Sequence, residues 1–147
     1  MDARPFVVAA AIAALAVPAA VLADGLGPHA NAYDQHPGST KPQNDVSLVV
    51  HRDTHKADLY VNNFCLGSQS FQGNSYPNSA IRRAVRVRKG KISFKGHGTI
   101  YMQNSQKQVP MGFVAAVKPK TVTGTAKFPG TQCGTIAFKA TLTQRTK

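Results

Sequence analysis

Carboxylate side chains are scarce in this sequence. There is no Glu among the 147 residues, and the last of the six Asp is Asp58, although 14 Lys and Arg follow it. General acid and base catalysis by paired carboxylates would therefore have to draw on the first part of the chain. No Gly-x-Ser-x-Gly elbow, phosphate-binding loop or His-Glu-x-x-His motif occurs either. These absences predict a protein that is not an enzyme, with no catalytic residue, no metal site and no cofactor.

The first residues have the pattern of an export signal. An apolar, Ala-rich run covers residues 6–23, follows Arg4 and ends in a small-x-small cleavage pattern before Asp24. We therefore expect a signal peptide over residues 1–23 and a secreted or envelope-associated protein with no transmembrane span after cleavage. A retained membrane anchor is the alternative, because the run is nearly long enough to span a bilayer.

Cysteine is also rare. Cys65 and Cys133 are the only two in the chain, and an even number of cysteines in an exported protein predicts one disulfide. In the chain-entropy description, closing a loop of about 69 residues stabilises the fold by roughly 4 kcal/mol. Free catalytic thiols are the alternative, which an oxidising compartment disfavours.

The remaining sequence divides into a leader and one domain. Residues 24–44 hold several Gly and Pro among small polar residues without hydrophobic periodicity, which predicts a flexible leader. In residues 45–147, apolar and polar residues alternate in short runs, most cleanly in 121–128 and 135–143. No helical period is sustained. The pattern predicts a single all-β domain of about eight strands.

Two arrangements of such strands are open. Turn spacings of this kind are typical of antiparallel sandwiches and of barrels. Tryptophan is absent and large aromatic residues are few, so the chain has little with which to line a ligand-binding barrel. We therefore expect an antiparallel β-sandwich, with a small up-and-down β-barrel as the alternative.

The most basic stretch, residues 81–95, has the pattern of a hairpin. Apolar residues alternate on both sides of Lys89-Gly90, which suits a two-residue turn. That turn would place Arg88 opposite Lys91 and Val85 opposite Phe94, and like charges directly across a ladder repel. A solvated outer face is the simplest interpretation, but the density of unpaired cations favours anion binding. The predicted anion-binding residues are Arg82, Arg86, Arg88, Lys89, Lys91 and Lys95.

One other cluster, residues 51–55, contains groups that bind metals. On a continuous strand His51, Asp53 and His55 would share one face and could form a site of two histidines and one carboxylate. Asp53-Thr54 is more typical of a turn, however, and a turn would point the three side chains in different directions. The sequence therefore predicts no metal site here.

Three segments carry a resemblance to a known group of proteins. They are residues 87–96 with their Lys-Gly-Lys turn, the Thr-Gly-Thr strand at 121–128, and residues 133–140 beginning at Cys133. Over about half of the chain after the export signal, the sequence resembles uncharacterised small secreted β-rich proteins of actinobacteria. The resemblance implies a secreted β domain with a disulfide, and it carries over no catalytic residue.

Two classes of function are consistent with these features. The first is a non-catalytic module that binds extracellular or cell-envelope polyanions, such as anionic polymers or an envelope surface, through the basic hairpin. No aromatic residues are interleaved with its charges for base stacking, which disfavours sequence-specific nucleic-acid recognition. The alternative is a structural or inhibitory envelope protein that acts through a protein–protein interface, for example with a loop at residues 76–80. The sequence leaves the oligomeric state open.

Overall fold

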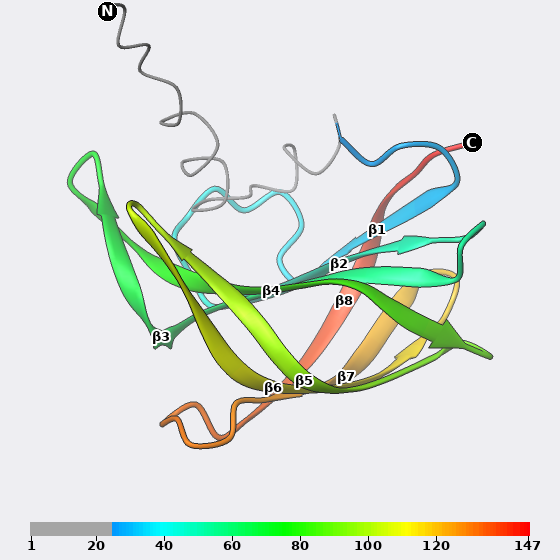
Figure 1. Ribbon diagram of the computed structural model, residues 1–147. Helices are drawn as coiled ribbons and strands as arrows, with labels where there is room; N and C mark the ends of the chain where they lie inside the picture. Colours follow the sequence, from blue (N-terminus) through cyan, green and yellow to red (C-terminus); the bar gives the residue numbers. More distant parts are fainter. Residues whose placement is uncertain (1–24) are drawn as a thin grey trace, which may run out of the picture.

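The computed structural model describes residues 25–147 (Figure 1). The predicted signal peptide, its cleavage site and the alternative membrane anchor lie outside these residues. Within them the chain forms eight strands: β1 (Ala30–Asp34), β2 (Asp45–His51), β3 (Lys56–Phe71), β4 (Asn74–Arg88), β5 (Lys91–Met102), β6 (Ser105–Val117), β7 (Thr121–Lys127) and β8 (Thr135–Arg145). The predicted all-β fold of about eight antiparallel strands is confirmed. Residues 25–147 contain no helix with the length and hydropathy needed to cross a bilayer.

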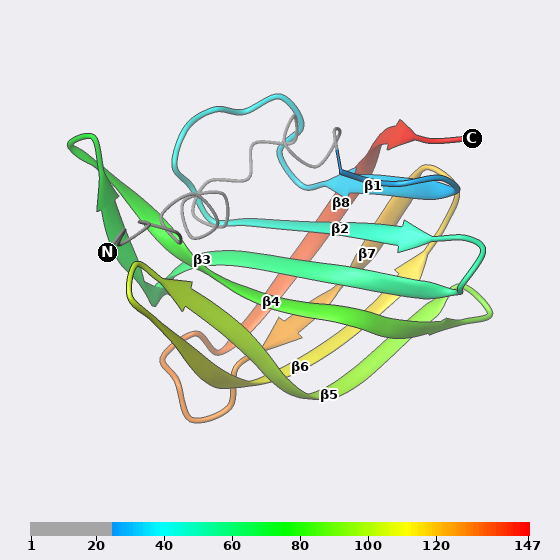
Figure 2. The ribbon, with the colours of Figure 1, turned by 45° about the horizontal axis from the view of Figure 1, so that its top comes forward.

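The strands follow one another around a single sheet. Each pairs antiparallel with the next in the chain, and β1 also pairs with β8, so that the sheet closes on itself (Figure 2). This hydrogen-bonding order is that of the up-and-down barrel, the alternative in the sequence analysis, and not of the two separate sheets of the expected sandwich. Period-two alternation and turn spacing are common to both arrangements, whereas closure of the sheet depends on the pairing of β1 with β8.

The strand that closes the sheet lies in the segment expected to be a flexible leader, and that expectation is wrong for residues 30–34. All five residues of β1 are buried, and only 1% of Tyr33 is exposed. Tyr33 packs into the barrel interior, whereas Ala30 and Ala32 pack into a second cluster with Leu26. Because both faces of β1 are buried, its sequence lacks the alternation that would have predicted a strand.

The apolar side chains form two groups on opposite faces of the sheet. The larger fills the barrel and includes Phe113 and Phe138, whose ring centroids lie 5.2 Å apart. The smaller lies on the other face of the first four strands. Its members are Leu26, Ala30, Ala32, Val49, Tyr60 and Ile81. The segment before β1 thus covers part of the outside of the barrel.

The predicted disulfide is confirmed. Cys65 on β3 is bonded to Cys133 in the loop between β7 and β8, with Cα atoms 5.2 Å apart. The two elements are not neighbours in the sheet, so the disulfide links distant parts of the barrel at one end. The turns after β2, β4 and β6 lie at the opposite end, on the right in Figure 1.

Candidate functional site

The tip of the β4–β5 hairpin has the predicted geometry. Lys89 and Gly90 both have positive φ, 48° and 70°, as a tight two-residue turn between twisted strands requires. Arg88 pairs with Lys91 and Val87 with Ile92. The expected pair further from the turn, Val85 with Phe94, is not formed, and Arg86 has no partner on β5.

The ladder is interrupted because β4 has an irregular conformation at Ala84. This residue has a φ of 56°, and its N–H donates to Asp58 Oδ1 on β3 over 2.8 Å. Regular pairing of β4 with β5 therefore lapses between Ile81 and Val87. This irregularity at Ala84 shifts the register of β4 against β5 between the two ends of the hairpin. The alternation of apolar residues in the sequence does not predict such a shift.

A hollow of about 720 Å³ lies beside the hairpin tip, where the β2–β3 turn meets β4. The N–H of Val87 donates to the carbonyl oxygen of His55 over 2.8 Å, and Lys56 pairs with Arg86 across the ladder. We call this site the basic hollow. It is lined by Thr54, His55, Lys56, Arg86, Val87, Arg88, Lys89 and Lys91.

The basic hollow brings together four of the six predicted anion-binding residues: Arg86, Arg88, Lys89 and Lys91. Lys56 and His55 also line the hollow, although the charge pattern of the hairpin did not predict them. Lys56 belongs to the site because β3 is the other neighbour of β4. The antiparallel order of consecutive strands could have indicated it, since such an order brings the β2–β3 and β4–β5 turns to the same end of the sheet.

Within residues 25–147, none of these cations forms a salt bridge with a carboxylate. The close contacts between carboxylates and basic side chains in these residues join Asp45 to His36, and Asp58 to His51 and Arg83. Like charges at contact distance repel by about 1 kcal/mol per pair in bulk water and by more at a protein surface. The cations of the basic hollow therefore repel one another unless anions or counterions screen them.

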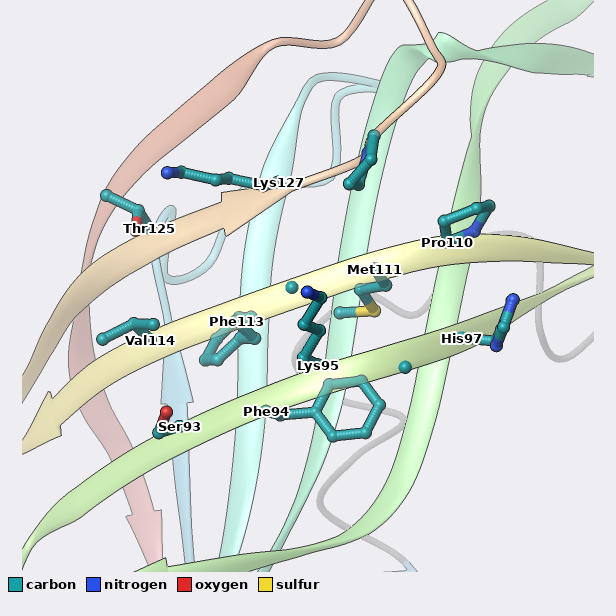
Figure 3. Close-up of a pocket in the computed structure, with 13 residues that line it drawn as sticks. Ser93, Phe94, Lys95, His97, Pro110, Met111, Phe113, Val114, Thr125 and Lys127 are labelled. Carbon is teal, nitrogen blue, oxygen red and sulfur yellow. The ribbon is translucent and has the colours of Figure 1, made fainter.

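The other two predicted residues lie elsewhere. The guanidinium of Arg82 lies over the ring of Phe94, 4.9 Å from its centroid, a geometry typical of a cation–π contact. Lys95 projects from β5 next to Gly112 and lines a second hollow (Figure 3). Neither residue contributes to the basic hollow.

The histidines of residues 51–55 are separated by a turn. His51 Nε2 lies 3.2 Å from Asp58 Oδ2, Asp53 Oδ1 accepts from the N–H of Thr54 over 2.8 Å, and His55 has a φ of 53°. In the described part of the chain, no group of three His, Cys, Asp or Glu side chains is arranged to hold a metal ion.

Two ionisable groups away from the basic hollow are perturbed by burial. Burial raises the pKa of the Asp34 carboxyl to about 6, with a further contribution from the nearby charge of Asp45. Burial also raises the pKa of Tyr60, against the effect of the Arg83 guanidinium, which donates to the Tyr60 hydroxyl over 3.1 Å. Both groups have structural partners, so neither extends the candidate site.

Comparison of the chain with protein-family models, with curated proteins and with solved structures finds no match in any of the three. The resemblance to secreted actinobacterial proteins therefore stays a prediction.

Proposed function

We propose that the protein is an exported, non-catalytic binding module that holds an extracellular or cell-envelope polyanion in the basic hollow. The observation that carries the proposal is the convergence of Lys56, Arg86, Arg88, Lys89 and Lys91 around one concave site. The guanidinium groups offer planar, bidentate donors to oxyanions such as phosphate or sulfate. The predicted signal peptide and the disulfide support an extracellular location.

A polymer suits this end of the barrel better than a single small anion. The N–H of Val117 donates to the carbonyl oxygen of Gly90 over 2.7 Å, which holds the β6–β7 turn beside the hairpin tip. That turn contains Lys118 and Lys120, both exposed. A chain of negative groups that begins in the basic hollow can therefore continue across these two lysines. No Phe, Tyr or Trp lines the hollow, so we propose recognition of backbone charge and not of bases.

The alternative is a protein–protein interface, and its expected loop is not present. Residues 76–80 belong to β4, and Pro77 to Ala80 are buried and paired with β3. This segment therefore does not form the exposed loop that an inhibitor would insert into a partner. A protein partner on another surface is an outcome that the following experiment distinguishes.

The test is retention of the disulfide-bonded chain from Asp24 onward on an immobilised sulfated polysaccharide across a salt series. The variant Arg86→Gln/Arg88→Gln/Lys91→Gln is compared with a control of equal charge, Lys41→Gln/Lys107→Gln/Lys139→Gln, whose exposed lysines lie outside the basic hollow. Each polyanion charge neutralised contributes about 0.7 to the slope of log affinity against log salt concentration. The hollow variant should therefore lose about 2 from this slope, and the control much less.

Equal release of the two variants would mean that net charge, and not the basic hollow, retains the protein. Retention that does not depend on salt would favour an uncharged or protein partner, because a polyanion complex must weaken as salt rises.

A further inference from the structure

The second hollow lies on the outer face of β5, β6 and β7 and has a volume of about 760 Å³ (Figure 3). Its centre is Gly112 on β6, which pairs with Lys95 of β5 on one side and with Lys127 of β7 on the other. Two lysines therefore flank a residue that has no side chain. We call this site the Gly112 hollow.

The surroundings of Gly112 are mainly apolar. Val114, two residues further along β6, is 57% exposed and lies between Ser93 and Thr125 on the neighbouring strands. Pro110 and Pro129 line the hollow beyond Gly112. A volume of this size is typical of small-molecule sites, which combine apolar walls with a few polar or charged groups.

Charge is the second feature of the Gly112 hollow. Lys95 and Lys127 are both exposed, and within residues 25–147 the ion pairs involve His36, His51 and Arg83 and neither of these lysines. Two strand spacings of about 4.8 Å separate their backbones. Figure 3 shows Lys95 extending from β5 toward β6. Because lysine has a flexible four-carbon stem, both ammonium groups can approach one anionic group placed over Gly112.

We infer that the Gly112 hollow binds a small amphipathic organic anion. Its apolar ring or chain lies against Val114 and Pro110, and its carboxylate or sulfonate lies between Lys95 and Lys127. This site is separate from the basic hollow and takes a different class of ligand, since exposed apolar walls do not match a hydrophilic polymer. The inference does not depend on the proposed polyanion binding.

The position of Gly112 provides a sharp test. A Cβ atom built on it would lie 3.8 Å from the carbonyl oxygen of Phe94 and 3.9 Å from Cβ of Lys127, which are ordinary contacts, and its φ is not positive. Gly112→Val should therefore fold, and valine favours a strand over glycine. The same change fills the centre of the hollow. Loss of binding with an equal or higher melting temperature is the expected signature.

The protein is expressed from the full chain and purified with its disulfide intact. It is then titrated with 1-anilinonaphthalene-8-sulfonate, and binding is followed by fluorescence. N-phenyl-1-naphthylamine, which has the same rings but no sulfonate, is the neutral comparison. We expect saturable binding of the sulfonate, at least tenfold weaker in Lys95→Gln/Lys127→Gln and lost in Gly112→Val. Binding of the neutral compound should be weaker and equal in wild type and the double lysine variant. Decanoate should displace the sulfonate, and decanol should not.

Two control variants locate the binding. Arg86→Gln/Arg88→Gln/Lys91→Gln, in the basic hollow, and Lys139→Gln on β8 should both bind the sulfonate like wild type. Undiminished binding by Gly112→Val would overturn the inference, as would equal binding of the charged and neutral compounds. Absence of saturable binding by wild type would also overturn it. Gly112→Ala, which adds only the Cβ atom, serves if Gly112→Val does not fold, and it should weaken binding without lowering the melting temperature.

Discussion

Removal of the disulfide should lower the free energy of unfolding by about 4 kcal/mol. The bonded residues, Cys65 and Cys133, are 68 positions apart. For a loop of this length the chain-entropy relation yields a loss of about 15 cal/mol/K in the unfolded chain, which is about 4 kcal/mol at 25 °C. The Cα separation of 5.2 Å lies within the usual range for disulfides. The folded backbone therefore does not have to move to form the bond.

The structure indicates that most of this loss arises in the unfolded state. The loop around Cys133 keeps its own hydrogen bonds, since the Thr131 hydroxyl donates to the Phe128 carbonyl over 2.6 Å and accepts from the N–H of Cys133 over 3.2 Å. Phe128 stays buried against the barrel interior. The native loop is thus held locally without the bond, whereas the unfolded chain gains the freedom of an open loop.

The assay is urea unfolding of wild type and Cys65→Ser/Cys133→Ser, followed by circular dichroism. Unfolding entropy of about 2.1 cal/mol/K per residue converts the loss to a fall in melting temperature of about 15 °C. The urea m-value should rise, because the unfolded chain without the bond exposes more surface. Each single serine variant should match the double variant. A loss below about 1 kcal/mol, or an unchanged m-value, would refute the unfolded-state explanation.

Two further predictions concern single residues. Folding raises the pKa of Asp34 from 3.8 to about 6, so the stability that its protonated carboxyl contributes is fully present below pH 3.8 and is lost as pH rises through 6. Asp34→Asn should therefore be more stable than wild type near pH 8. A difference in unfolding free energy between the two proteins that does not grow from about pH 4 to about pH 8 would contradict this. A Cβ atom added at Gly124 would collide with the carbonyl oxygen of Val114 and lie 2.7 Å from Ala115 Cβ. Gly124→Ala should therefore lower the free energy of unfolding in urea by about 3 kcal/mol, whereas Gly112→Ala should not lower it. Equal effects at the two glycines would contradict the difference in the space around them.

Most of the strands after β1 and the hairpin tip were predictable because their causes are local. Alternation of Ile136, Phe138 and Ala140 with polar residues needs only neighbours two positions apart, and the positive φ values of Lys89 and Gly90 follow from a two-residue turn. The disulfide followed from the count of two cysteines together with the pattern of an export signal. None of these depends on knowing which strands meet.

The two hollows depend on contacts between distant segments. The charge pattern identified Arg86, Arg88, Lys89 and Lys91, but Lys56 joins them only through the pairing of β3 with β4. Lys95 was assigned to the same surface because it is close in sequence. Its true neighbour is Gly112, with Lys127 on the far side, and the interruption at Ala84 changes how the lower part of the hairpin is arranged.

By itself, the sequence determined that the domain is all-β, that the β4–β5 turn is tight and basic, and that its cations have no acidic partners after Asp58. Tertiary structure decided that β1 closes the sheet with β8, and that Lys95 lies in a different hollow from Arg86, Arg88, Lys89 and Lys91. The physical reason is the range of the interactions. Strand alternation and turn conformation are set within a few residues, whereas closure and concave surfaces arise from the register between strands far apart in the chain.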